Sequence, residues 1–338
     1  MKTPDFWKTD LDYIEKIFKE SKNCTEKRAL CRSAGGRPIY MMAYGEKKRR
    51  GSANYSSALG AQDKNCFCPK DQKQCVILIG AVHGAETEGV AALTNLISLL
   101  ETGVDLSGNR NDALLTAASG IRLVIIPVAN VDGRARVKLD SMIGHTFEEL
   151  RYWCQGTWAD GSLCGWPACK RVHPIKNVGF LGGYYNDDGV NLMHDNFFNP
   201  MAEETRAILD LCESEAADFV IHLHGGGNIK GGMLPTHYVT AECSRAIEEL
   251  YQRCQAVGER EGLEYINLGI PAVPSGENPP SFNLVSATHH VCGAVAACYE
   301  SNEGILDEPG LNVRLSHEQI LKMHAILFEE CFKMAQGK

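Results

Sequence analysis

The chain has 338 residues, of which 44% are hydrophobic, so it can bury the core of one large α/β domain or of two smaller ones. Its 42 acidic and 34 basic residues give a net charge of -8, which argues against nucleic acid as a partner. The N-terminal segment lacks the apolar stretch of a secretion signal, and no apolar run is long enough to span a bilayer. We therefore expect no membrane partner and a cytoplasmic location.

Apolar runs and helical periodicities alternate along the chain. Apolar residues at helical spacing predict an amphipathic helix over residues 10–19, and further helices are predicted over 88–100, 201–216 and 316–334. Continuous apolar runs predict strands buried on both faces over 75–80, 121–128, 219–223 and 293–299. Residues 231–280 are interpreted as helical segments separated by turns. The alternation predicts an α/β fold in which helices cover both faces of a mostly parallel sheet.

Residues 134–188 show neither the periodicity of a helix nor that of a strand. This stretch contains three tryptophans and three cysteines, which makes disorder a poor explanation, and a segment this long without regular structure is commonly functional. We expect it to be an ordered covering segment near the site. Since no linker or repeat divides the chain, we expect a single domain over residues 1–338 with an insertion at about 134–188.

The fourteen cysteines are scattered, which favours reduced thiols over a disulfide framework. Two groups are close enough in sequence for a second, structural zinc to be considered, but neither has paired Cys-x-x-Cys spacing. Free or buried thiols are the alternative that we favour. The groups are Cys66, Cys68 and Cys75, and Cys154, Cys164 and Cys169 with His173.

The first candidate metal ligands are His83 and Glu86, which directly follow the predicted strand 75–80. Open α/β sheets place their ligands at the carboxyl ends of strands. A histidine and a carboxylate three residues apart can bind one metal ion together, and catalytic zinc takes three protein ligands and leaves one position open. A helix N-terminal glutamate beside an ordinary histidine would give the same pattern. The pair therefore needs a third ligand.

A third ligand is available at the end of the predicted strand 219–223, where His222 and His224 precede three glycines. The two side chains point the same way because side chains alternate along a strand. We assign the metal to His224, which is nearest the strand end, and expect His222 to support it or to line the pocket. Two imidazoles that merely filled a strand terminus would need polar partners.

Glu300, at the end of the predicted strand 293–299, is the candidate catalytic base. A zinc hydrolase needs a carboxylate that takes a proton from the attacking water and passes it to the leaving group. Glu303 lies in the following loop and is the alternative. The strand-end position favours Glu300.

In this order the motifs resemble those of the zinc carboxypeptidase family, which includes carboxypeptidase A. The His-x-x-Glu pair is followed by an Asn-x-Asp-Gly turn at 130–133, a stretch similar to Gly-Val-Asp-Leu-Asn-Arg at 189–194, the strand-end His and the strand-end Glu. Residues 33–39 are similar to the family's early Ser-x-x-Gly-Arg hairpin. The resemblance implies an α/β/α sandwich with a mixed, mostly parallel central sheet, one zinc ion per chain, and hydrolysis of an amide bond by metal-activated water.

The chain departs from the family where a substrate's terminal carboxylate would be clamped. The family's Asn-Arg pair is replaced by Met193 and His194, and a histidine cannot copy the two-pronged geometry of a guanidinium group. His194 and Asn191 remain our candidate substrate-binding residues.

The arginine that would stabilise the oxyanion is assigned to Arg136. Arg134 and Arg171 are the alternatives, and an ordinary surface arginine would explain each of them equally well.

The sequence thus predicts a zinc metallopeptidase of carboxypeptidase type that acts on a peptide. The missing Asn-Arg pair leaves open an amidase or deacylase of N-acyl amino acids, similar to the succinylglutamate desuccinylase and aspartoacylase branch. A binding protein that keeps the fold without catalysis is a further alternative, although the three ligands and the base argue against it. The sequence does not decide the oligomeric state.

Overall fold

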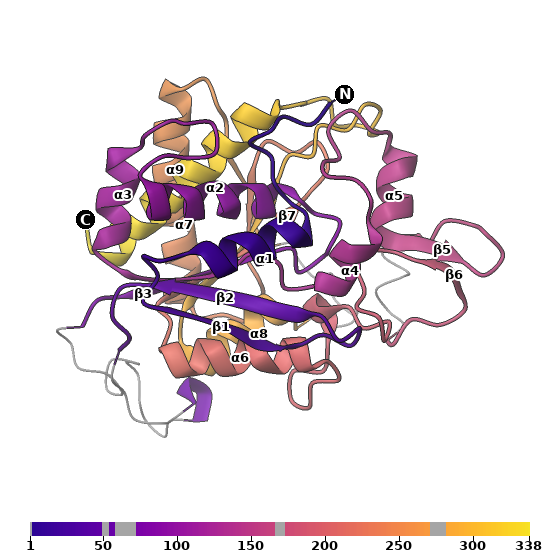
Figure 1. Cartoon of the computed structure of the whole chain (residues 1–338), viewed down its shortest axis with the longest axis horizontal. Helices are drawn as coiled ribbons and strands as arrows, with labels where there is room; N and C mark the ends of the chain where they lie inside the picture. Colours follow the sequence, from indigo (N-terminus) through magenta and orange to yellow (C-terminus); the bar gives the residue numbers. More distant parts are fainter. Residues whose placement is uncertain (1, 49–53, 58–71, 166–172, 271–281) are drawn as a thin grey trace.

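The computed structural model describes residues 2–48, 54–57, 72–165, 173–270 and 282–338 (Figure 1). Within these ranges an eight-stranded sheet has the order β1-β2-β4-β3-β7-β10-β8-β9. Its four central strands are parallel to one another: β4 (Arg122–Ile126), β3 (Cys75–Gly80), β7 (Phe219–Gly225) and β10 (Val295–Ser301). Every residue of β3 and β4 is buried, which explains their continuous apolar sequences. The four predicted strands are confirmed.

The outer strands make the sheet mixed. At one edge β1 (Glu26–Arg32) and β2 (Pro38–Tyr44) form an antiparallel hairpin, and β2 is antiparallel to β4. At the other edge β8 (Gly232–Leu234) is antiparallel to β10, while β9 (Ile266–Asn267) is parallel to β8. The hairpin that the family resemblance implied near residues 33–39 is present.

Helices cover both faces of the sheet, as Figure 1 shows. Alternate strand residues such as Leu78 and Ile77 enter two separate apolar cores, because successive side chains point to opposite faces. The first core packs against α2 (Glu88–Thr102), α3 (Asp112–Ser119), α7 (Ala241–Arg260) and α9 (His317–Ala335). The second packs against α1 (Leu11–Glu20), α6 (Glu203–Glu215) and α8 (Leu284–Cys292). The predicted α/β/α sandwich is confirmed.

The segment without sequence periodicity has regular structure of its own. It contains the end of α4 (Val131–Arg136), then α5 (Phe147–Gln155) and a separate antiparallel pair, β5 (Gly156–Trp158) and β6 (Val178–Leu181). A small apolar core joins it to the loop after β3 through Cys154, Val137 and Ala85. In the ranges that the structure describes, no helix combines the length and the apolar character needed to cross a bilayer.

The start of α2, behind the loop after β3, buries an acidic side chain completely. Glu88 has no exposed surface, and its Oε2 has no hydrogen-bond partner among the described residues. Burial raises the pKa of Glu88 to about 8, and the negative charge of Glu86 adds to this effect. The carboxyl group is therefore largely protonated at neutral pH.

This burial predicts a pH-dependent stability. The pKa of a glutamate in the unfolded chain is about 4.3, so between that value and about pH 8 unfolding releases a proton and stability falls as pH rises. The side chain of Glu88→Gln cannot ionise. With both proteins metal-free, the variant should therefore be more stable than the unaltered protein by on the order of 3 kcal/mol at pH 7.5, with little difference at pH 4.5. Urea unfolding at both pH values measures this difference.

The exposed Glu20 at the end of α1 provides the matched control, because Glu20→Gln should change stability little at either pH. A Glu88→Gln variant that is less stable than the unaltered protein at pH 7.5 would contradict the prediction.

Candidate metal centre

His83, Glu86 and His224 meet at the carboxyl ends of β3 and β7. The Nδ1 atom of His83 lies 2.8 Å from Oε1 of Glu86, and the Nδ1 atom of His224 lies 2.8 Å from Oε2 of the same carboxylate. One ligand atom from each residue lies within 4.8 Å of the others, and all three side chains are buried. The structure thus brings together the three residues that the sequence predicts as ligands.

Their convergence follows from the register of the sheet. In the parallel pairing of β3 with β7, Gly80 is opposite Leu223, so β3 ends one residue before the position of His224. The chain then turns through Ala81, which has a positive φ of 46°, into the buried loop that carries His83 and Glu86. Both ligand-bearing segments therefore leave the sheet at one place.

Glu86 is held as a carboxylate between the two imidazoles. Burial by itself would raise the pKa of Glu86, but the charges of His83 and His224 and their hydrogen bonds outweigh it and lower this pKa to about 2. Two imidazole nitrogens and one carboxylate oxygen form a donor set of catalytic zinc sites. The residues present therefore fit a zinc ion.

Asn191 lies behind His83. Its Oδ1 is 3.3 Å from Nε2 of His83 and also accepts a hydrogen bond from the Met193 N–H at 2.9 Å. Metal-binding histidines commonly donate their second N–H to such an acceptor, which fixes the orientation of the ring. Asn191 has no exposed surface and supports His83, and its contact with a substrate stays a prediction.

His194 follows at the end of the short 3₁₀ helix η4 (Leu192–His194) and is half-buried. Its role in substrate binding stays a prediction.

Glu300 and Glu303 have different surroundings. Glu300 is half-buried beside His224, its partner in the β10–β7 register, and accepts a hydrogen bond from the Cys298 thiol at 3.3 Å. Glu303 is buried, accepts from Gly227 N–H at 2.7 Å, and donates its own N–H to the Gly227 carbonyl. Burial, together with the charges of Glu88 and Glu86, raises the pKa of Glu303 well above its usual value. Glu303 therefore holds the loop through Gly227, and Glu300 is the half-buried carboxylate beside His224.

The arginines contact backbone segments around the site. Arg136 donates to the carbonyl oxygens of Leu181, Gly182 and Tyr185 and pairs with Asp187. Through these contacts Arg136 holds the backbone around residues 181–185, and they do not support the predicted oxyanion role.

Arg134 is buried beneath Gly84 and donates to the carbonyl oxygens of Thr9, Gly84 and Leu139. Arg171 lies outside the described residues. Arg134 and Arg136 thus both donate to backbone carbonyl groups, and which arginine stabilises the oxyanion stays a prediction.

Two further residues surround the ligands. The ring of Tyr184 stacks on His83 with ring centroids 4.1 Å apart and planes at 26°. No sequence signal pointed to Tyr184, which lies in the segment without periodicity. His222 is fully buried, with Nε2 3.3 Å from the Thr288 hydroxyl oxygen. Burial, with a contribution from His224, lowers the pKa of His222 to about 3, so it stays neutral.

No second metal-binding group appears among the described residues, since the only cluster of three or more possible ligands there is His83, Glu86 and His224. In the two cysteine groups, Cys75, Cys154 and Cys164 are buried thiols. Cys66, Cys68 and Cys169 lie outside the described residues. The described members of the two groups form no cluster of three or more possible ligands.

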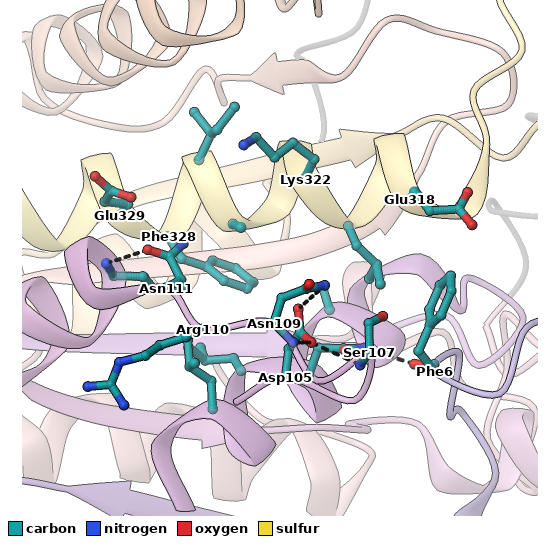
Figure 2. A pocket seen from close by; sticks show the side chains of 18 of the residues that line it. Phe6, Asp105, Ser107, Asn109, Arg110, Asn111, Glu318, Lys322, Phe328 and Glu329 are labelled. Carbon is teal, nitrogen blue, oxygen red and sulfur yellow. Dashed lines mark hydrogen bonds between the residues drawn. The ribbon is translucent and has the colours of Figure 1, made fainter. Parts of the chain in front are cut away.

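A pocket of about 630 Å³ lies elsewhere, between α9 and the segment that joins α2 to α3 (Figure 2). Leu96, Leu114 and Phe328 are among its apolar residues, while Arg110 and Lys322 belong to its charged rim. None of its lining residues is a candidate site residue.

Comparison with known proteins agrees with this arrangement. No curated protein sequence matches the chain. Solved structures with a similar fold include metallo-carboxypeptidases from Burkholderia cenocepacia (14% identity, TM-score 0.57, 95% of this chain and 66% of that one) and Pseudomonas aeruginosa (13%, 0.58, 96% and 68%). Carboxypeptidase A from Helicoverpa armigera is also similar (14%, 0.55, 98% and 74%). The chain spans about two thirds of the length of the two bacterial proteins, and at these identities the likeness shows the fold.

The family comparison covers both histidine ligands. Residues 11–231 match the family model described as zinc carboxypeptidase. That range includes α1, both ligand-bearing strands and the covering segment. It also includes His83, Glu86 and His224, which the structure brings together. The chain therefore belongs to the zinc carboxypeptidase family of metallopeptidases.

Proposed function

We propose that the protein is a zinc-dependent carboxypeptidase-like peptidase that hydrolyses an amide bond by attack of water. The observation that carries this proposal is the register of β7 and β10, which puts the half-buried Glu300 beside His224, one of the three buried candidate ligands. A carboxylate next to a metal site is the arrangement required for general base catalysis on water.

Each residue then has a defined task. His83, Glu86 and His224 would hold one zinc ion, which would supply Lewis acidity and lower the pKa of a water molecule. Glu300 accepts the proton of the attacking water and transfers it to the departing amine. The thiol of Cys298 donates a hydrogen bond to the Glu300 carboxylate and so helps to orient it. No covalent intermediate with the chain is required.

A peptide is the substrate class that family membership favours. Met193 is buried and His194 is half-buried at the place where the family's Asn-Arg pair would bind a terminal carboxylate, so a free C-terminus need not be the feature recognised. A panel of C-terminally free peptides, C-terminally amidated peptides and N-acyl amino acids distinguishes the peptidase from the deacylase alternative. For location we propose the cytoplasm, where thiols stay reduced, because the cysteines are scattered along the sequence and do not form a short disulfide framework.

Removing His224 should abolish stoichiometric zinc binding. The unaltered protein should retain one zinc ion per chain after dialysis against metal-free buffer, while His224→Ala should retain almost none, because two ligands remain of the three that such sites use. Metal analysis by mass spectrometry measures both. His145→Ala, which removes a partly exposed imidazole outside the cluster, is the control and should keep its zinc. Equal zinc content in the unaltered protein and His224→Ala would refute the assignment.

Replacing the base should separate catalysis from metal binding. Glu300→Gln keeps the shape of the side chain but cannot accept a proton, so kcat should fall about 10²–10⁴-fold while zinc content stays unchanged. Glu303→Gln is the matched variant, since its amide oxygen can still accept the Gly227 N–H. Steady-state kinetics with the peptide that the unaltered protein cleaves fastest measures kcat for both variants. A greater loss in Glu303→Gln than in Glu300→Gln would exchange the two roles.

A further inference from the structure

We propose that Tyr184 is a positioning residue of the metal centre, whose aromatic ring holds the imidazole of His83 in the orientation that binds the metal. The inference rests on the proposed function, because it concerns the same site, and it assigns a task to the covering segment. Its basis is the stacked contact between the two rings, 4.1 Å between centroids with planes at 26°.

The hydrogen-bond partners of His83 restrain its ring in a different direction. Glu86 and Asn191 meet the two nitrogen atoms of His83 at 2.8 Å and 3.3 Å, and hydrogen bonds to both nitrogens restrain the ring within its own plane. His224 approaches at a steep angle of 72°, with centroids 4.9 Å apart. The Tyr184 ring lies nearly parallel to the imidazole and covers one of its faces. Tilting of the imidazole toward that side is therefore blocked by Tyr184.

Tyr184 can position the His83 imidazole only if Tyr184 is itself held in place. The Tyr184 N–H donates to the Cys154 carbonyl at 2.9 Å, and the Gly183 N–H donates to the Trp153 carbonyl at 2.7 Å. The Gly183 carbonyl in turn accepts the Gly84 N–H at 2.7 Å, and Gly84 is the residue directly after His83. A backbone hydrogen bond between the neighbouring residues Gly84 and Gly183 thus holds the segment of Tyr184 against that of His83.

The glycines make this contact possible. A Cβ atom at Gly183 would lie 2.8 Å from the Ala85 nitrogen, and one at Gly84 would lie 2.1 Å from the Arg134 nitrogen. A larger residue at Gly183 would force the segment of Tyr184 away from the loop of His83, and one at Gly84 would force that loop away from α4. The position of the Tyr184 ring over His83 therefore depends on direct backbone contact.

The test compares an aromatic and an aliphatic replacement. Tyr184→Phe keeps the ring and should bind zinc as tightly as the unaltered protein, whereas Tyr184→Leu lacks the flat face and should bind about 10–100-fold more weakly, the loss typical of residues that support metal ligands. Affinity is measured by competition with a chromophoric chelator. The visible absorption spectrum of the Co²⁺-substituted protein reports the ligand geometry independently of activity and should shift only in Tyr184→Leu.

Tyr152→Leu is the matched control. Tyr152 also stacks on an aromatic ring of the covering segment, Phe180, with centroids 4.6 Å apart and planes at 5°, but it is exposed and does not contact His83. Its replacement should leave zinc affinity and the Co²⁺ spectrum unchanged. A comparable loss of affinity in Tyr152→Leu would overturn the proposal, because any disturbance of the segment would then suffice.

Other outcomes are equally decisive. Wild-type affinity in Tyr184→Leu would overturn the proposal, as would a Phe variant as weak as the Leu variant, since the hydroxyl group would then carry the effect. If Tyr184→Leu fails to fold, Gly183→Ala takes its place, because it retains the tyrosine but displaces it; unchanged zinc affinity in that variant would also overturn the proposal. Failure of the unaltered protein to bind zinc would instead refute the proposed function itself.

Discussion

The close approach of three backbone segments at Gly84 and Gly183 is the contact on which the metal centre depends. The loop that carries His83 and Glu86 packs against the turn of α4 on one side and against the covering segment on the other, with no side chain between them. Gly183 provides the acceptor for Gly84, and its carbonyl also accepts a hydrogen bond from the Asn130 side chain at 3.2 Å. One carbonyl group therefore joins the metal-binding loop, the turn after β4 and the covering segment.

The acidic residues around the centre differ in the direction in which their pKa values are shifted. The charges and hydrogen bonds of two imidazoles lower the pKa of Glu86, whereas burial raises the pKa of Glu88 and that of Glu303. Three ionised carboxylates in so small a buried volume would repel one another strongly. As the structure stands, a divalent cation would meet the Glu86 carboxylate and two imidazoles, and Glu300 lies beside them in a half-buried position.

The sequence predicted the parts of the fold and site that depend on local patterns. The central strands are continuous apolar runs, and the two histidines, Glu86 and Glu300 follow such runs directly, so their meeting at one edge of the sheet could be predicted. The hairpin of β5 and β6 could not, because it is short and lacks alternation. The place of Tyr184 depends on a contact between residues about a hundred positions apart, and the role of Arg136 on carbonyl groups that every residue carries. Neither leaves a pattern in the local sequence.

The amide of Asn191 has a consequence for the lifetime of the bound metal. An amide oxygen carries no formal charge, so it increases the basicity of the His83 imidazole less than a carboxylate at the same place would. The resembling stretch of the family has an aspartate there. We therefore expect faster exchange of the ion with its surroundings than a carboxylate-supported site would allow. Which divalent ion occupies such a site is then governed more by local supply than by retention of the first ion bound.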